Sequence, residues 1–225
     1  EWNCSIWQRD TTNDTCFKAA WIFHDIFENY DRPQAFGYWL LTDFIEERLP
    51  RNGSPYFGGF GMFNYHGIPK ASWAALSLLQ KTGDVCLSSG NGYFITRRES
   101  SVQIFLYHYT HYDNMYRLCN QIPVAASQAY EVFLPCPSRQ YHITITGIPA
   151  DTVQIKTYIL NQEYGSSFDK WISMGQPKNI RTDEINYLKS SASPHIHIQT
   201  QTISQSLTLE PLLHAHDCML YELSF

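Results

Sequence analysis

The chain has 225 residues, a formal net charge of −5 and 44% hydrophobic residues, of which many are aromatic. Such a composition is typical of a globular chain that forms one large domain, or one medium domain and part of another. The sequence has neither a basic stripe nor a run of eighteen apolar residues, so we expect no membrane segment, and contact with DNA only through another part of the protein.

Six cysteines lie scattered along the chain without the CxxC spacing of redox or zinc sites: Cys4, Cys16, Cys86, Cys119, Cys136 and Cys218. In a chain large enough to build a core, we interpret them as buried free thiols of a reducing compartment, which favours a cytoplasmic protein. Disulfide bonds are the alternative.

The chain begins EWN, without an initiator methionine, and we interpret these residues as the end of a β-strand whose preceding residues are absent. Asn13 and Asp14 are good N-cap residues, and apolar residues follow at helical spacing as far as Phe27, which predicts a helix ending near 29–33. The apolar run 35–42, AFGYWLLT, is typical of a strand covered on both faces, as in a parallel sheet.

A glycine-rich stretch, SPYFGGFGMFNYHG, comes next, and then a second helix that we expect to start at Pro69 and to close at Gly83. Residues 58–61, GGFG, lack the lysine and the strand–loop–helix setting of a phosphate-binding loop. We therefore expect them to mark a place where the backbone is crowded and only glycine fits.

After Gly83 the apolar period changes from 3.6 to 2. Strand candidates follow one another between turn-forming residues: GYFITRR, SVQIFLYHYT, YHITITGI, TVQIKTYILN, HIHIQT, QSLTL and CMLYELS. One short helix interrupts them, TDEINYLKSS, with Thr182 as its expected cap. Many short strands with little helix between them predict an antiparallel β-sandwich, with a domain boundary near residue 83.

The residues alone also suggest a sugar-binding site. A strand–helix–strand order is typical of a (β/α)₈ barrel, whose catalytic groups lie at the C-terminal ends of the strands. Retaining glycosidases need two carboxyl groups and an aromatic wall, so Glu1 could be the nucleophile and Trp39 the wall. Three acidic residues after Trp39 could meet sugar hydroxyls: Asp43, Glu46 and Glu47. A solvated Glu1 and a core Trp39 remain the plainer alternatives.

Six segments in order, EWN, NDTCFKAAWI, FGYWLLTDFIEE, FGGFGMFNYHGIPKASWAAL, GYFITRR and FDKWISMG, resemble glycoside hydrolase family 39, the family of β-xylosidases and α-L-iduronidases. The resemblance implies an α/β plus all-β chain: residues 1–83 as the last two strand–helix units of a TIM barrel, and residues 84–225 as an accessory β-sandwich. It also implies that Glu1 occupies the nucleophile position and that Trp39 lines the sugar subsite. Further substrate-binding positions follow from it at Glu47, Glu46 and Asn3.

The family's acid/base glutamate belongs to an Asn-Glu-Pro motif, which these residues lack. The resemblance therefore implies that an upstream part of the same polypeptide completes the barrel and carries the second catalytic group. Two parallel strands cannot close a barrel, and their free edges would be prone to aggregation. We expect a separate stretch of polypeptide to cover them.

Three segments, YWLLTDFIEE, GIPKASWAAL and LYHYTHYDNMYRL, are similar to the family-39-like module that follows the DNA-binding domain of AraC-type transcription regulators. This predicts a sugar-binding or vestigial-enzyme module whose partner is a xylose-type sugar or oligosaccharide. One alternative is an active, secreted retaining β-xylosidase or related exo-glycosidase. The other is a non-catalytic interaction module.

Two histidine pairs, His195 with His197 and His214 with His216, have the i, i+2 spacing that places side chains on one side of a strand, and Cys218 follows the second pair. Strand alternation alone produces this pattern, and no further ligand is evident, so we predict no metal site and no cofactor. We interpret the aromatic segment 108–116, HYTHYDNMY, as a sandwich strand with its covering loop.

Overall fold

The computed structural model describes residues 2–32, 35–45, 53–118, 124–204 and 206–225. Its helices are α1 (Cys16–Glu28), α2 (Ala71–Leu79), α3 (Asn114–Leu118), α4 (Ser167–Ser173) and α5 (Thr182–Ser191). Its strands are β1 (Val85–Gly90), β2 (Tyr93–Arg98), β3 (Ser101–Tyr107), β4 (Arg139–Gln140), β5 (Ile143–Thr146), β6 (Thr152–Leu160), β7 (His195–Thr202), β8 (Ser206–Leu209), β9 (Leu212–Leu213) and β10 (Cys218–Ser224). Short 3₁₀ turns occupy Thr11–Asp14, Asp43–Ile45 and Ala126–Gln128.

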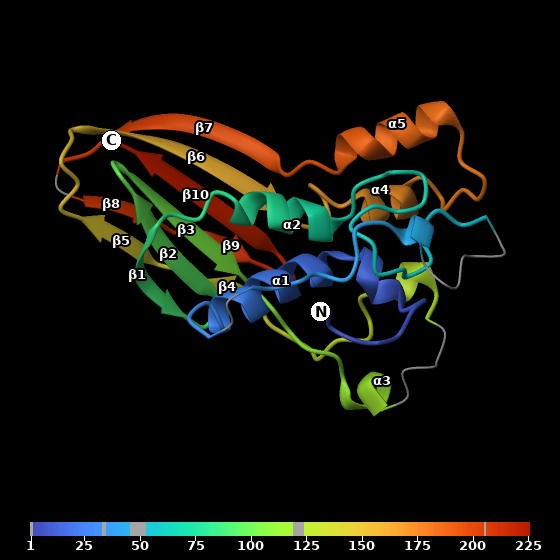
Figure 1. Cartoon of the computed structure of the whole chain (residues 1–225). Helices are drawn as coiled ribbons and strands as arrows, with labels where there is room; N and C mark the ends of the chain where they lie inside the picture. The colour runs from blue at the N-terminus through green and yellow to red at the C-terminus, as the bar shows by residue number, and fades with distance from the viewer. Residues whose placement is uncertain (1, 33–34, 46–52, 119–123, 205) are drawn as a thin grey trace.

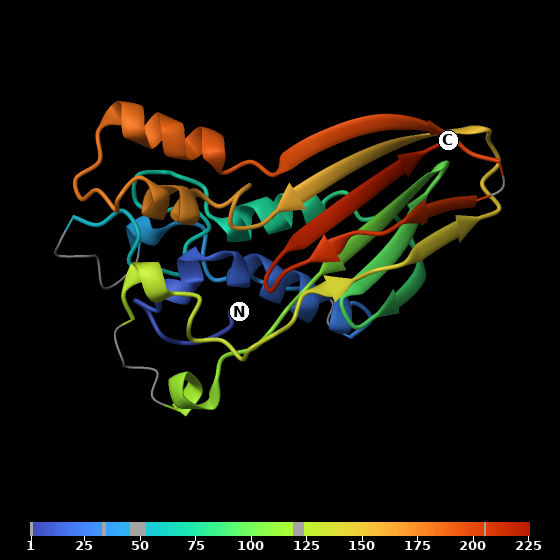
Figure 2. The same ribbon diagram turned by 180° about the vertical axis from the view of Figure 1, so that it is seen from behind.

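An antiparallel β-sandwich forms one half of the molecule (Figure 1). Its large sheet has the strand order β1-β2-β3-β10-β6-β7, and a second layer is made of the pairs β4–β9 and β5–β8. Apolar side chains of β3, β6 and β10 meet those of β5 and β8 between the layers, with Ile104, Ile155 and Leu207 fully buried. The predicted sandwich is therefore confirmed, and Figure 2 shows the small layer on the face away from α1 and α2.

Helices α1 and α2 cover the other face of the large sheet (Figure 1). Phe27 of α1 stacks on Phe94 of β2 with 4.4 Å between ring centroids, and Phe23 meets Phe105 of β3 edge to face at 5.6 Å. A single core cluster thus joins side chains from both sides of Gly83. The domain boundary near residue 83 stays a prediction, and the hydrophobic core runs across it.

The predicted helices are present, but their N-caps differ from those expected. Asn13 and Asp14 lie in a 3₁₀ turn, and Thr15 is the N-cap of α1. At α5 the extended residue Arg181 is the N-cap, and its backbone N–H donates to the Glu184 carboxylate at 2.6 Å. Thr182, the expected cap, is the first helical residue.

The apolar run 35–42 was predicted to be a strand, and its described residues form only short parallel contacts. Tyr38 bridges Trp2, and Thr42 bridges Phe63. Neighbouring segments therefore lie on both sides of the run, so residues 38–42 present no fully hydrated edge. The residues that the structure describes do not form a closed barrel. None of the described helices is long and apolar enough to cross a membrane.

Candidate functional site

The first described residues lie beside the segment that carries Trp39. The Trp2 N–H donates to the Gly37 carbonyl at 2.8 Å, and the Trp39 N–H donates to the Trp2 carbonyl at 3.0 Å. The Trp2 indole also stacks on Trp21 of α1, with ring centroids 4.4 Å apart. Chain order and pairing thus bring two predicted site residues, Asn3 and Trp39, to one place. Glu1, Glu46 and Glu47 lie outside the described residues.

Asn3 links the chain start to Trp39 through both ends of its amide. Its Oδ1 accepts hydrogen bonds from Lys18 Nζ at 2.7 Å and from the Cys4 N–H at 2.8 Å, and its Nδ2 donates to the Trp39 carbonyl. The Trp39 side chain is 45% exposed, and the peptide bond to Leu40 is cis. A half-exposed indole beside a fixed amide can offer an apolar ring face together with polar neighbours, as sugar rings require.

Lys18, which binds the Asn3 amide, was not predicted from the sequence to lie near Trp39. It is wholly buried on α1, contacts Cys4 Sγ at 2.6 Å and lies 5.2 Å from the centroid of the Trp21 ring. A lysine in a helix is usually read as solvent-exposed. The signal was nevertheless present, because Lys18 is the one charged residue in CFKAAWIF, a stretch with no polar face to receive it.

A second cluster of polar side chains is fully buried next to the segment that follows Trp39. Lys70, the N-cap of α2, forms ion pairs of 2.6 Å with Asp14 Oδ1 and with Asp43 Oδ2, and all three side chains are 0% exposed. Asp43 was expected to meet sugar hydroxyls, and this expectation is wrong, because its carboxylate is buried against Lys70.

Burial is the main cause that raises the pKa of Asp14 to about 6, and Lys70 opposes the shift. Burial alone would lower the pKa of Lys70, but the two carboxylates raise it.

The glycine-rich loop wraps this ion-pair cluster. The Gly58 N–H donates to Asp14 Oδ2 and the Gly61 N–H to Asp43 Oδ1, each at 2.7 Å, and Lys70 Nζ donates to the Gly59 carbonyl at 3.0 Å. Any Cβ at Gly59 or Gly61 would collide with Asp43. The predicted crowding at 58–61 is thus confirmed, and its cause is the approach of the loop backbone to two buried carboxylates.

A further carboxylate, that of the partly buried Asp169, lies at the start of α4. It accepts hydrogen bonds from the hydroxyls of Tyr130 at 2.7 Å and Ser166 at 2.5 Å, and its N–H returns to Ser166 Oγ at 3.2 Å. Burial raises the pKa of Asp169 to about 6 against these hydrogen bonds. Ser166 is the N-cap of α4, so this group holds the end of a helix.

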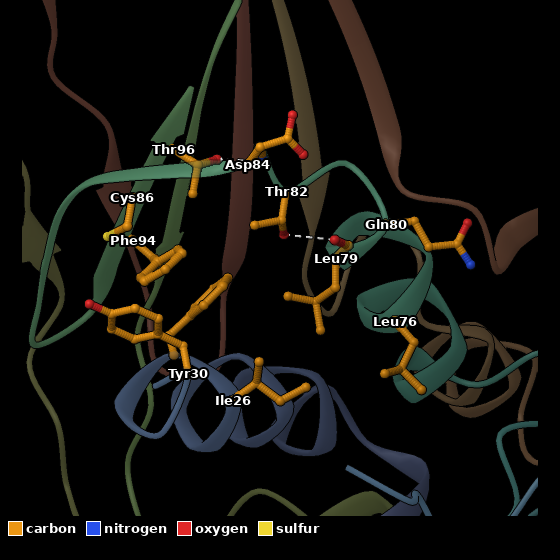
Figure 3. A pocket seen from close by; sticks show the side chains of 12 residues that line it. Ile26, Tyr30, Leu76, Leu79, Gln80, Thr82, Asp84, Cys86, Phe94 and Thr96 are labelled. Atoms are coloured by element: carbon orange, nitrogen blue, oxygen red, sulfur yellow. Dashed lines mark hydrogen bonds between the residues drawn. The ribbon is translucent and has the colours of Figure 1, made fainter. Parts of the chain in front are cut away.

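A separate cavity of about 530 Å³ opens between α1, α2 and the sheet (Figure 3). Ile26, Leu76, Leu79 and Phe94 supply its apolar walls, and Gln80 and Asp84 add polar side chains to its lining. The Thr82 hydroxyl donates to the Leu79 carbonyl at 2.7 Å. Neither Asn3 nor Trp39, the two predicted site residues that the structure brings together, lines this cavity, so it is distinct from the pair that they form.

The histidine pairs do not converge. His195 and His197 are exposed on β7, His214 meets Ser138 Oγ at 2.7 Å, and His216 lies buried in a turn before β10 rather than in a strand. Within the described ranges, no three His, Cys, Asp or Glu residues could hold a metal ion. The cysteines described are free, and Cys86 is exposed, contrary to the expectation that all are buried.

The described residues define an α/β region packed on an antiparallel β-sandwich, with a half-exposed tryptophan beside a fixed asparagine. A family model, glycosyl hydrolases family 39, matches residues 1–207. The chain belongs to this family.

Three relatives show how far the likeness extends. A β-xylosidase of Geobacillus stearothermophilus is 26% identical over 87% of this chain, and a helix-turn-helix-type transcriptional regulator of Staphylococcus aureus, itself uncharacterized, is 23% identical over 92%. The aligned parts make up 34% and 26% of those proteins, so the chain spans about a third or less of their length. A monomeric β-xylosidase from Caulobacter crescentus has the same fold, with a TM-score of 0.80 and 22% identity over 99% of this chain and 44% of that one.

Proposed function

We propose that this chain is the sugar-binding part of a family-39 module in an AraC-type transcription regulator of the cytoplasm, and that its ligand is a xylose-type sugar or oligosaccharide. The observation that carries the proposal is the fixed geometry of Asn3 and Trp39, in which the amide is held at both ends and the indole is half exposed. Aromatic faces beside polar groups are well suited to sugar rings.

In this proposal Glu1 directs its carboxylate to the sugar beside Trp39, and Glu46 and Glu47 hydrogen-bond to sugar hydroxyls. An upstream part of the same polypeptide completes the barrel, and DNA is bound through an upstream domain. The likeness to the Staphylococcus aureus regulator, which extends over 92% of the chain, supports the regulator.

Calorimetry tests the binding proposal. Xylose and xylobiose are titrated into the full-length protein and into its Trp39→Ala variant, and we expect the variant to bind about tenfold more weakly, because it loses the stacking face. Tyr187→Ala is the matched control, since Tyr187 is 50% exposed on α5, outside the group around Trp39, and its loss should leave binding unchanged. Absence of heat with either sugar, from a folded protein, contradicts the proposal.

The similarity to β-xylosidases favours a second candidate, a retaining exo-glycosidase in which Glu1 attacks the anomeric carbon and an upstream glutamate acts first as acid and then as base. Glu1→Gln keeps the shape of the side chain and removes the nucleophile. If the enzyme exists, this change should lower the turnover of a nitrophenyl xyloside more than about 10³-fold. Background rates in both proteins, together with sugar binding by calorimetry, would leave the regulator proposal standing and remove the enzyme for that substrate.

A further inference from the structure

Strand β7 is the outermost strand of the large sheet (Figures 1 and 2). It pairs with β6 without a break, from the Thr152–Thr202 pair to the Ile159–His195 pair. All eight of its residues are exposed, so within the described part of the chain neither face of β7 is covered and its outer edge has no strand neighbour. A free edge of this length offers a row of unpaired N–H and C=O groups to another strand.

The opposite edge of the same sheet is built differently. The register of β1 against β2 shifts between Cys86 and Ser88, a bulge that interrupts the regular edge. Bulges, charged side chains and prolines are the usual means by which edge strands avoid pairing with other chains. The sequence of β7, HIHIQTQT, has no bulge, no proline and no Asp, Glu, Lys or Arg. Of the two edges, β7 is therefore the one that is open to pairing.

The residues of β7 also match a second copy of the same strand. Two antiparallel copies related by a two-fold axis place even-numbered residues opposite even-numbered ones, because opposite residues must point to the same face. The even face consists of β-branched side chains: Ile196, Ile198, Thr200 and Thr202. The odd face consists of imidazoles and amides: His195, His197, Gln199 and Gln201. Every two-fold register thus pairs β-branched with β-branched residues and hydrogen-bonding side chains with each other.

The side chains of β7 also allow two copies to approach each other. The chain carries a net charge of −5, but β7 contains no Asp, Glu, Lys or Arg, so two copies that meet along it bring no such side chains of that strand into contact. Ile196 and Ile198, 49% and 55% exposed, would lose contact with water in such a pair, and this burial favours association.

We propose that β7 is a homodimer interface, in which two copies of the protein pair their β7 strands antiparallel about a two-fold axis and continue the six-stranded sheets into one. The register centred on Ile198 places this side chain opposite its own copy and pairs Ile196 with Thr200. An extended segment of another protein and an upstream part of this polypeptide are the competing occupants, and the experiment separates them. The proposal does not depend on the bound sugar or on catalysis.

The test measures the mass of the full-length protein by sedimentation equilibrium across a wide concentration range. We expect a reversible dimer for the unchanged protein. The Ile198→Lys variant should have a dimer dissociation constant at least about tenfold higher, because two like charges would lie opposite each other at the axis. Val85→Lys is the matched control, since Val85 is 47% exposed on β1, at the other edge, and this change should leave the constant unaltered.

A mixing experiment distinguishes the two-fold pairing from other associations. Ile198→Lys and Ile198→Glu should each be mainly monomeric, and an equimolar mixture should regain dimers through opposite charges at the axis. Should Ile198→Lys not fold by circular dichroism, Thr200→Lys places the charge on the same face and carries the same expectation. Three results would each overturn the proposal: a monomer at every concentration, a dimer indifferent to all of these variants, or slow amide exchange along the outer edge of β7 in the monomer.

Discussion

The side-chain amide of Asn3 forms hydrogen bonds at both its oxygen and its nitrogen. Because Lys18 and the Cys4 N–H occupy its oxygen, the nitrogen is the group that turns to the Trp39 carbonyl, and the orientation of the amide is fixed by its partners. Proximity of Asn3 to Trp39 followed from the expected parallel strands. The role of Lys18 did not, since helical periodicity shows which residues are apolar and not which polar side chain is buried among them.

His216 is a buried titratable residue whose effect on stability has a definite sign. Its ring packs against Phe133, with centroids 4.3 Å apart, and burial, assisted by His108, lowers its pKa from 6.5 to about 3. Between these values the unfolded chain binds a proton at this position and the folded chain does not. The free energy of unfolding should therefore fall as the pH drops from 6.5 toward 3, by up to about 1.4 kcal/mol per pH unit from this group.

Urea unfolding of His216→Asn and of the unchanged protein at several pH values checks this prediction. Asparagine tolerates the positive φ of 70° at this position, although the variant loses ring packing. We expect the variant to be less stable near pH 7 and the difference to shrink as the pH falls. Comparing the two proteins isolates His216 from Asp14 and Asp169, whose raised pKa values act in the opposite direction. An unchanged slope in His216→Asn would refute the prediction.

Lys70 joins elements that are far apart in the sequence. Lys70 is the N-cap of α2, at the end of the loop that precedes this helix. Its side chain pairs with Asp14, just before α1, and with Asp43, shortly after Trp39. The glycine-rich loop covers all three side chains. Helix packing alone would leave these segments free to slide. The buried charges require one arrangement, because each carboxylate is desolvated and must meet both Lys70 and a backbone N–H.

The change Lys70→Met tests this linkage. Methionine is apolar and of similar length, so it leaves two buried carboxylates without their cation and should lower the free energy of unfolding by about 3–5 kcal/mol. Lys81→Met is the matched control, since Lys81 is one-third exposed and its 3.3 Å pair with Glu222 should contribute about 1 kcal/mol or less.

Denaturant unfolding measures both losses. Adding Asp14→Asn and Asp43→Asn to Lys70→Met should recover part of the stability, because the buried negative charges are then removed together with the cation. A loss for Lys70→Met no larger than for Lys81→Met would contradict the assigned role of the cluster.

Periodicity predicted the elements better than the contacts between them. The helical spacing up to Phe27 and the alternation in TVQIKTYILN both correspond to observed elements, because burial of one face is what such patterns report. The apolar run 35–42 was wrongly predicted to be a regular strand, because an apolar run indicates burial but not which backbone groups pair along it. Asp43 misled for a related reason: its buried cation, Lys70, lies 27 positions further on, and nothing near it in the sequence announces a partner. The pairs β4–β9 and β5–β8 join residues sixty or more positions apart, beyond the reach of local patterns.

The large sheet is shared between two cores. Side chains on one of its faces pack with α1 and α2, and those on the other pack with β5 and β8. A protein divided near residue 83 into independent units would have a break in packing between the helices and the sheet. Phe23 and Phe27 instead contact Phe105, which is itself fully buried. We therefore predict that residues 1–83 and 84–225 open together.

Hydrogen exchange in the full-length protein tests this prediction through the change Leu207→Ala. Leu207 is fully buried on β8, on the face of the sheet away from α1, and its truncation should cost about 2–5 kcal/mol. If the chain opens as one unit, the opening free energy of the slowest α1 amides falls by the same amount as that of the β3 amides. Leu212→Ala makes the same chemical change at a 50% exposed position and should alter neither. A loss of protection confined to the sandwich strands, with α1 unaffected, would show instead that residues 1–83 form an independent folding unit.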